Sequence, residues 1–189
     1  MHFRNIHINF QAIALVFLNA LLVFQLHAQP PGTTYYWIGD GGNWTDPNHW
    51  SSASGGVPGT VIPGQDDAVV FDNNSFTIAN QEVLINQHAS FFSMDWSNIT
   101  NDQVLLFDST LYAHGDITLN KRLSLLRNVN FSGIQFIEQS VFNADSASID
   151  CAFTIIMDSI TDSLILASDV LMSDSSSCIV FTGISNSIT

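Results

Sequence analysis

The sequence predicts an all-β fold, a parallel β-solenoid resembling a right-handed β-helix, and two observations lead to this class. After residue 28, no stretch shows the 3.6-residue periodicity of an amphipathic helix. Instead, short apolar runs alternate with turn-forming Asn, Asp, Ser and Gly, and between residues 104 and 156 the centres of these runs recur every 6 to 7 residues. Short runs bounded by turn formers are typical of strands. The alternative, a β-sandwich or jelly roll, needs longer strands at wider spacing, so the tight spacing favours the solenoid.

The first element, residues 1–28, has the three parts of a secretory signal peptide. Arg4 supplies the positive charge, residues 12–26 form the apolar region, and Ala28 is a small residue at the cleavage edge. We therefore expect a mature chain that begins at Gln29, is exported through the periplasm, and is then secreted or held at the cell surface. The alternative is an uncleaved membrane anchor, but the apolar run is short for a bilayer span.

The mature chain would be strongly acidic. It would carry 17 Asp and Glu residues against three cations, Lys121, Arg122 and Arg127, a net charge of −14. Binding of nucleic acid requires clustered cations that release phosphate counterions. Nucleic acid is therefore not an expected partner, and an anionic membrane surface is disfavoured for the same reason.

The second element, residues 29–70, is rich in Trp, Gly and Pro and is predicted to cap the solenoid. A solenoid needs a cap because its first coil otherwise exposes a sheet edge and an open core. Trp37, Trp44 and Trp50 lie within 14 residues. They are interpreted as the core of this cap, and the alternative is an exposed platform on which sugar rings stack.

The third element, residues 71–189, is predicted to form roughly five coils. About 20 to 25 residues would climb one sheet spacing of ~4.8 Å, with apolar side chains stacked inward. Polar residues would occupy the turns. Strands are expected at residues 68–71, 82–85, 104–107, 116–119, 123–126, 129–131, 134–137, 141–142, 153–156, 163–166 and 178–181. Nothing that resembles a second cap follows residue 181, so we expect the coils to be truncated at the carboxy-terminal end.

The motif W-I-G-D-G-G-N-W-T-D-P-N-H-W-S at residues 37–51, followed by G-G-V-P-G at 55–59, resembles the amino-terminal region of large secreted surface proteins of the Bacteroidota. Residues 92–101 and 111–119 resemble solenoid coils of the same proteins. The resemblance implies export by the type IX route and an adhesin-like role, with further domains downstream. Four Asp-Ser motifs also resemble the O-glycosylation motif of proteins exported by these bacteria, and we expect modification of at least one of Ser109, Ser146, Ser159 and Ser163. The alternative is that Asp-Ser is simply a common composition of polar turns.

The carboxylates of the cap are the only residues that suggest a cofactor. Asp40, Asp46, Asp66 and Asp67 could supply oxygen ligands to calcium, but their spacing matches no calcium loop, and turn capping is the competing interpretation. His49, His88 and His114 lack the close pairs of a zinc site. We expect no cofactor other than calcium.

The two cysteines, Cys151 and Cys178, are candidates for a disulfide between neighbouring coils, since export passes through an oxidising compartment. The alternative is that both are small hydrophobic residues of the core.

The expected function is that of a non-catalytic structural or adhesin-like segment, whose partners would be extracellular glycans, surface proteins or downstream domains of the same chain. Two alternatives remain. One is a carbohydrate-binding module that uses the Trp-rich cap. The other is a β-helix polysaccharide lyase or hydrolase, for which the chain offers few cations, because Lys121 and Arg122 are adjacent and would point to opposite faces of a strand.

Overall fold

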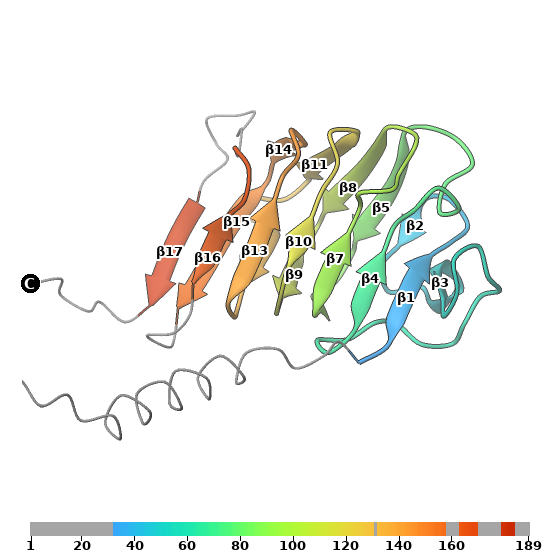
Figure 1. Cartoon of the computed structure of the whole chain (residues 1–189), viewed down its shortest axis with the longest axis horizontal. Coiled ribbons are helices and arrows are strands. Elements are labelled where there is room, and N and C mark those ends of the chain that lie inside the picture. The colour runs from blue at the N-terminus through green and yellow to red at the C-terminus, as the bar shows by residue number, and fades with distance from the viewer. Residues whose placement is uncertain (1–31, 131, 158–162, 170–178, 184–189) are drawn as a thin grey trace, which may run out of the picture. The chain divides into compact units, whose positions relative to one another are not determined.

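The computed structural model describes residues 32–130, 132–157, 163–169 and 179–183, and in them the chain forms a parallel β-solenoid of three sheets (Figure 1). Sheet A contains, in spatial order, β16 (Leu164–Leu166), β13 (Ser140–Asn143), β10 (Ile117–Thr118), β7 (Ser93–Asp95), β4 (Ala68–Val70), β1 (Thr34–Trp37) and β3 (Trp50–Ser51). Sheet B contains β14 (Ser148–Asp150), β11 (Leu123–Arg127), β8 (Gln103–Phe107), β5 (Gln81–Ile85) and β2 (Gly42–Asn43). Sheet C contains β17 (Ile179–Gly183), β15 (Ala152–Met157), β12 (Gly133–Phe136), β9 (Thr110–Ala113) and β6 (Ala89–Phe91).

Successive strands of the chain visit sheets A, B and C in turn, so that three strands make one coil. The described residues contain four complete coils, which begin at β4, β7, β10 and β13. β16 and β17 continue sheets A and C beyond them, with residues outside the described part between the two strands. The all-β solenoid prediction is confirmed, and the sandwich alternative is wrong because nearly all strand pairs are parallel between coils.

The core consists of columns of like residues stacked from coil to coil. In sheet B, Val83, Leu105, Leu125 and Ile149 occupy equivalent positions, 22, 20 and 24 residues apart, and all four side chains are fully buried. These intervals agree with the predicted coil length. Each residue of a column loses its water contact only because the coils above and below cover it, which is how a solenoid builds a core from short strands.

An aromatic stack fills the corner between sheets A and B. The rings of Phe71 and Trp96 lie 3.6 Å apart and nearly parallel, at 4°, and Phe76 packs against both. The backbone N–H of Phe71 donates to the carbonyl of Asp95 in the next coil. The ring stack therefore lies in register with the backbone ladder.

The cap is continuous with the solenoid. β1 pairs in parallel with β4, and β2 pairs in parallel with β5, so both extend the sheets by one level. β3 runs antiparallel to β1 and occupies the outer edge of sheet A. An antiparallel edge strand ends the parallel stack and reduces the number of unpaired backbone groups, as expected of a cap.

Two details of the sequence prediction are wrong. No strand lies at 129–130, because the Ser132 N–H donates to the Val129 carbonyl and closes a turn there; residue 131 lies outside the described part. Lys121 and Arg122 lie in the turn before β11, so the argument that placed them on opposite faces of a strand does not apply.

Several strands of the structure were not predicted, among them β6, β7, β9 and β14. The shortest of these present a single inward side chain, and one side chain forms no apolar run.

Within the described residues, no helix is long and apolar enough to span a bilayer. The predicted signal peptide, the end of the chain after residue 183, and the expectation of truncation all fall outside the described part and stay predictions.

Candidate functional site

The three indoles of the cap are buried and form its core. Trp37, Trp44 and Trp50 have no exposed surface, and the Trp50 ring contacts each of the other two edge-on at about 5 Å. The Trp37 indole N–H donates to the Asp40 carbonyl at 2.6 Å, and the Trp50 indole N–H donates to the Trp44 carbonyl at 2.8 Å. No ring face is left for a sugar, so the sugar-platform hypothesis at these residues is wrong and the cap-core interpretation is correct.

His49 packs into the core of the cap. Its ring stacks on Trp37 at 4.7 Å with an interplanar angle of 6°, and its Nδ1 lies 2.8 Å from the Ile38 carbonyl oxygen. Gly42 lies directly against the other side of the ring, where a Cβ would overlap the imidazole. The second glycine of the Gly-Gly pair in the sequence motif therefore makes room for this histidine, whereas the first, Gly41, lies against the backbone of Glu82.

Three of the four carboxylates proposed as calcium ligands accept hydrogen bonds from the protein itself. Asp40, in a left-handed conformation at φ 66°, accepts hydrogen bonds from the N–H and hydroxyl of Thr77. Asp67 accepts from the N–H groups of Thr33 and Gly64, both at 2.9 Å.

Asp46 has the same kind of role at the start of η1 (Pro47–His49), where its carboxylate accepts from the backbone N–H of Asn48. This bond holds the pKa of Asp46 below its ordinary value. Asp66 is exposed, and its carbonyl accepts from Gly32. In the described ranges, no group of three or more His, Cys, Asp or Glu side chains is arranged to hold a metal ion. Turn capping therefore describes Asp46 and Asp67, whereas Asp40 joins two levels of the structure and Asp66 contributes its backbone carbonyl.

Two of the three described cations form ion pairs with carboxylates of neighbouring coils. Arg122 contacts Asp102 at 3.0 Å, and Arg127 contacts Asp150 at 3.2 Å, with only 11% of the Arg127 side chain exposed. Lys121 is exposed in the turn before β11. Two of the three cations that a lyase mechanism would draw on thus tie adjacent coils together.

The two remaining histidines also bridge coils. His88 Nδ1 lies 3.1 Å from the Ser109 hydroxyl, and His114 Nδ1 lies 3.3 Å from Glu138. The Ser109–His88 pair resembles half of a nucleophilic triad, but it is largely exposed to solvent, and no carboxylate of the described residues contacts the His88 ring. Such a pair lacks the orienting acid and the water-excluding surroundings on which nucleophilic catalysis depends.

Three of the four proposed glycosylation serines are described. Ser146 is exposed at the tip of a tight turn in which Asp145 and Ser146 both have positive φ, whereas Ser109 and Ser163 are half-buried. Ser159 lies outside the described residues.

Of the two cysteines, only Cys151 is described. It is fully buried, and burial, reinforced by the neighbouring charge of Asp150, raises the pKa of its thiol to about 12. Cys178 lies outside the described residues, so the disulfide stays a prediction.

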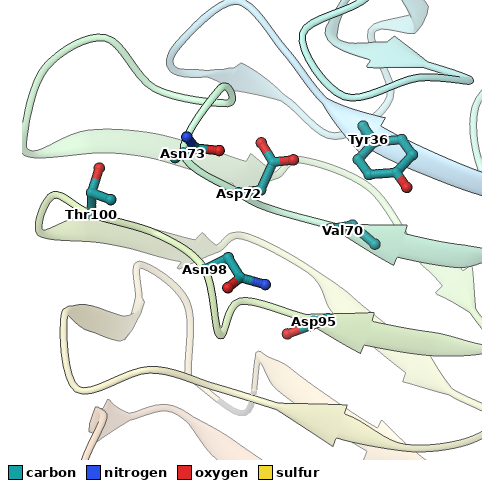
Figure 2. Close-up of a pocket in the computed structure, with 7 residues that line it drawn as sticks. All are labelled: Tyr36, Val70, Asp72, Asn73, Asp95, Asn98 and Thr100. Atoms are coloured by element: carbon teal, nitrogen blue, oxygen red, sulfur yellow. The ribbon is translucent and has the colours of Figure 1, made fainter.

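An open groove of about 640 Å³ lies on the outer face of sheet A, across β1, β4 and β7 and the turns that follow the last two (Figure 2). We call it the outer groove, and its lining consists of Tyr36, Val70, Asp72, Asn73, Asp95, Asn98 and Thr100. Tyr36, Val70 and Asp95 are consecutive partners in the strand register, so their side chains project from the same face. The groove thus combines one aromatic ring with carboxylate, amide and hydroxyl groups.

Sequence reasoning did not find the outer groove. The available signal was the coil length, because Val70 and Asp95 are 25 residues apart, as are Asn73 and Asn98. Aligning the chain on that period places these residues on adjacent levels of one face. The position of Tyr36 one level further down depends on the parallel pairing of β1 with β4, which the interpretation of residues 29–70 as a loop-rich cap did not include.

No protein-family model, curated protein or solved structure matches this chain.

Proposed function

We propose that the chain is an exported, non-catalytic structural segment of a cell-surface protein, with an adhesin-like role. The observation that carries the proposal is how the charged side chains of the solenoid are used. Arg122 and Arg127 pair with carboxylates one coil away, Asp40 accepts hydrogen bonds from Thr77 one level further along, and Asp67 accepts from Thr33 beside β1. These groups hold coils in register, which suits a rigid spacer.

The sequence supports the cellular part of the proposal. Residues 1–28 have the charge and apolar pattern of a signal peptide, and the Trp-rich motif resembles exported surface proteins. The acidic composition suits a soluble extracellular surface and disfavours nucleic acid. The lyase or hydrolase alternative is weakened because two of its three candidate cations are engaged in ion pairs.

Export is tested in the native cell by following the protein with an antibody. We expect the wild-type chain to be digested by protease added to intact cells, or to be recovered from the medium. Leu22→Arg, which puts a charge into the apolar region of the leader, should leave the protein inside the cell. The matched control is His2→Arg, which adds the same charge outside that region and should not block export. Protection of the wild-type chain from protease in intact cells, together with its absence from the medium, would contradict the proposal.

A further inference from the structure

The outer groove is lined by polar groups that are available for hydrogen bonds to a ligand. In the described part of the chain, the hydroxyls of Tyr36 and Thr100, the side-chain amide of Asn73 and one carboxylate oxygen of Asp95 have no protein hydrogen-bond partner. They come from three successive levels of the solenoid and line one groove (Figure 2). Several adjacent polar groups without internal partners can hydrogen-bond a ligand without breaking existing bonds.

Hydrogen bonds from neighbouring groups of the protein orient the two carboxylates of the groove, those of Asp72 and Asp95. Asp72 accepts from the Asn74 N–H at 2.8 Å and from the Ser54 hydroxyl at 2.6 Å. Asp95 accepts from the Ser97 N–H at 2.7 Å through one oxygen, which leaves the other free. Groups oriented before binding lose less conformational entropy when a ligand arrives. The groove is therefore partly organised for recognition.

The chemistry of the lining points to a sugar. Tyr36 offers an aromatic face on which the C–H face of a pyranose ring can pack, and amides and carboxylates bind vicinal hydroxyls. From Tyr36 to Asp95 is two strand spacings, about 10 Å, the length scale of a disaccharide. The groove is open rather than enclosed, which suits a chain that crosses the surface more than a small molecule that must be engulfed.

The charge of the groove restricts the kind of sugar. The lining contains two carboxylates and no cation, and the chain as a whole has a net charge of −13. An acidic polysaccharide would bring like charges together in the groove, which opposes binding. A neutral sugar avoids this repulsion.

We propose that the outer groove is a binding site for a neutral polysaccharide, with Tyr36 packing on a sugar ring and Asp95 and Asn73 binding its hydroxyls. This proposal names the class of ligand that an adhesin-like segment would bind, and it therefore rests on the proposed function. Binding is measured on purified protein, whereas export is measured on cells, so that either proposal can fail alone.

The test is affinity electrophoresis and calorimetry of the purified protein against soluble neutral polymers, namely a mixed-linkage β-glucan, xyloglucan, galactomannan and yeast mannan, and against two acidic ones, polygalacturonate and alginate. Each is run in EDTA. We expect at least one neutral polymer to bind and neither acidic polymer to do so. Tyr36→Ala and Asp95→Asn should each weaken binding about tenfold or more, as for central contacts of a recognition site.

The matched control is Tyr112→Ala, because Tyr112 is also a half-buried tyrosine, on β9 of sheet C and away from the groove. It should bind like wild type. Tyr36→Phe should retain most of the binding, and circular dichroism establishes that each variant is folded. The proposal is overturned if no neutral polymer binds, if only acidic polymers bind, or if Tyr36→Ala binds as tightly as Tyr112→Ala. A separate calorimetric titration with calcium, without EDTA, also overturns it if calcium binds, Asp95→Asn abolishes that binding and no neutral polymer is retained, since the groove would then be a cation site.

Discussion

The stack of Phe71 and Trp96 allows a prediction of how substitutions change the free energy of unfolding, in both sign and size. Trp96 is fully buried and its ring centre lies 3.6 Å from that of Phe71, yet its indole N–H has no hydrogen-bond partner among the residues that the structure describes. An unpaired buried donor costs about 1–3 kcal/mol, because the group has lost its water and gained nothing in return. The tryptophan therefore contributes packing at the expense of one unsatisfied polar group.

Two substitutions separate these contributions. Trp96→Ala removes the whole ring and should lower the free energy of unfolding by about 3–5 kcal/mol, as for other large-to-small changes in cores. Trp96→Phe keeps a ring on Phe71 but removes the N–H. The lost burial, about 1–3 kcal/mol for the smaller ring, is offset by relief of the unpaired donor, so the net change should lie within about 2 kcal/mol of zero.

Trp37→Phe is the matched control. Trp37 is equally buried, but its N–H donates to the Asp40 carbonyl, so this change loses burial and a hydrogen bond together. It should destabilise the protein by about 2–4 kcal/mol. The measurement is urea unfolding followed by far-UV circular dichroism, with comparison restricted to variants whose m-values agree. If Trp96→Phe destabilises the protein as much as Trp37→Phe, the reasoning about the unpaired donor is refuted.

Three further predictions follow from other residues. Gly133→Ala should destabilise the protein by about 1–3 kcal/mol or more in urea unfolding, because its Cβ would overlap the Ala152 carbonyl oxygen in the adjacent coil, whereas Gly64→Ala, where a Cβ would have room, is the control. The Cys151 thiol has a pKa of about 12 in the native state and near 9.0 in the unfolded chain. Between these two pH values the native state therefore binds one more proton than the unfolded state. Stability measured in reductant should therefore be unaffected by this thiol below pH 9 and fall by about 1.4 kcal/mol per pH unit above it, and this extra slope should be absent from Cys151→Ala. Mass spectrometry of the exported protein should find an amino terminus at Gln29, and recovery of intact Met1 outside the cell would contradict the signal-peptide prediction.

Much of the fold was predictable from local pattern. Runs such as 82–85, 104–107 and 123–126 contain two or more inward apolar residues, and each is a strand of sheet B in the structure. Their spacing also set the coil length, because one turn of chain must return each apolar residue to the column below it. These features depend on residues close together in the sequence, which is why the sequence alone revealed them.

The short strands and the candidate site were not predictable in the same way. β7 contributes a single inward residue, Met94, and is held as a strand by its pairing with β4 and β10 rather than by its own composition. The tryptophans of the cap had two interpretations because composition does not reveal which way a ring faces. Only the tertiary structure, in which Trp37 packs between His49 and Phe71, shows that the tryptophans form the core of the cap.

The sequence by itself determined the class of fold, the length of a coil and the acidic character of the surface, since each follows from the order or number of residues. Tertiary structure decided which polar groups form hydrogen bonds within the protein and which are available to a ligand. Asp40 and Asp95 are both aspartates near a turn, yet both oxygens of Asp40 bond Thr77 from another coil, whereas Asp95 keeps one oxygen facing a groove. Their roles differ because a hydrogen-bond partner 37 residues away along the chain is brought near only when the coils stack.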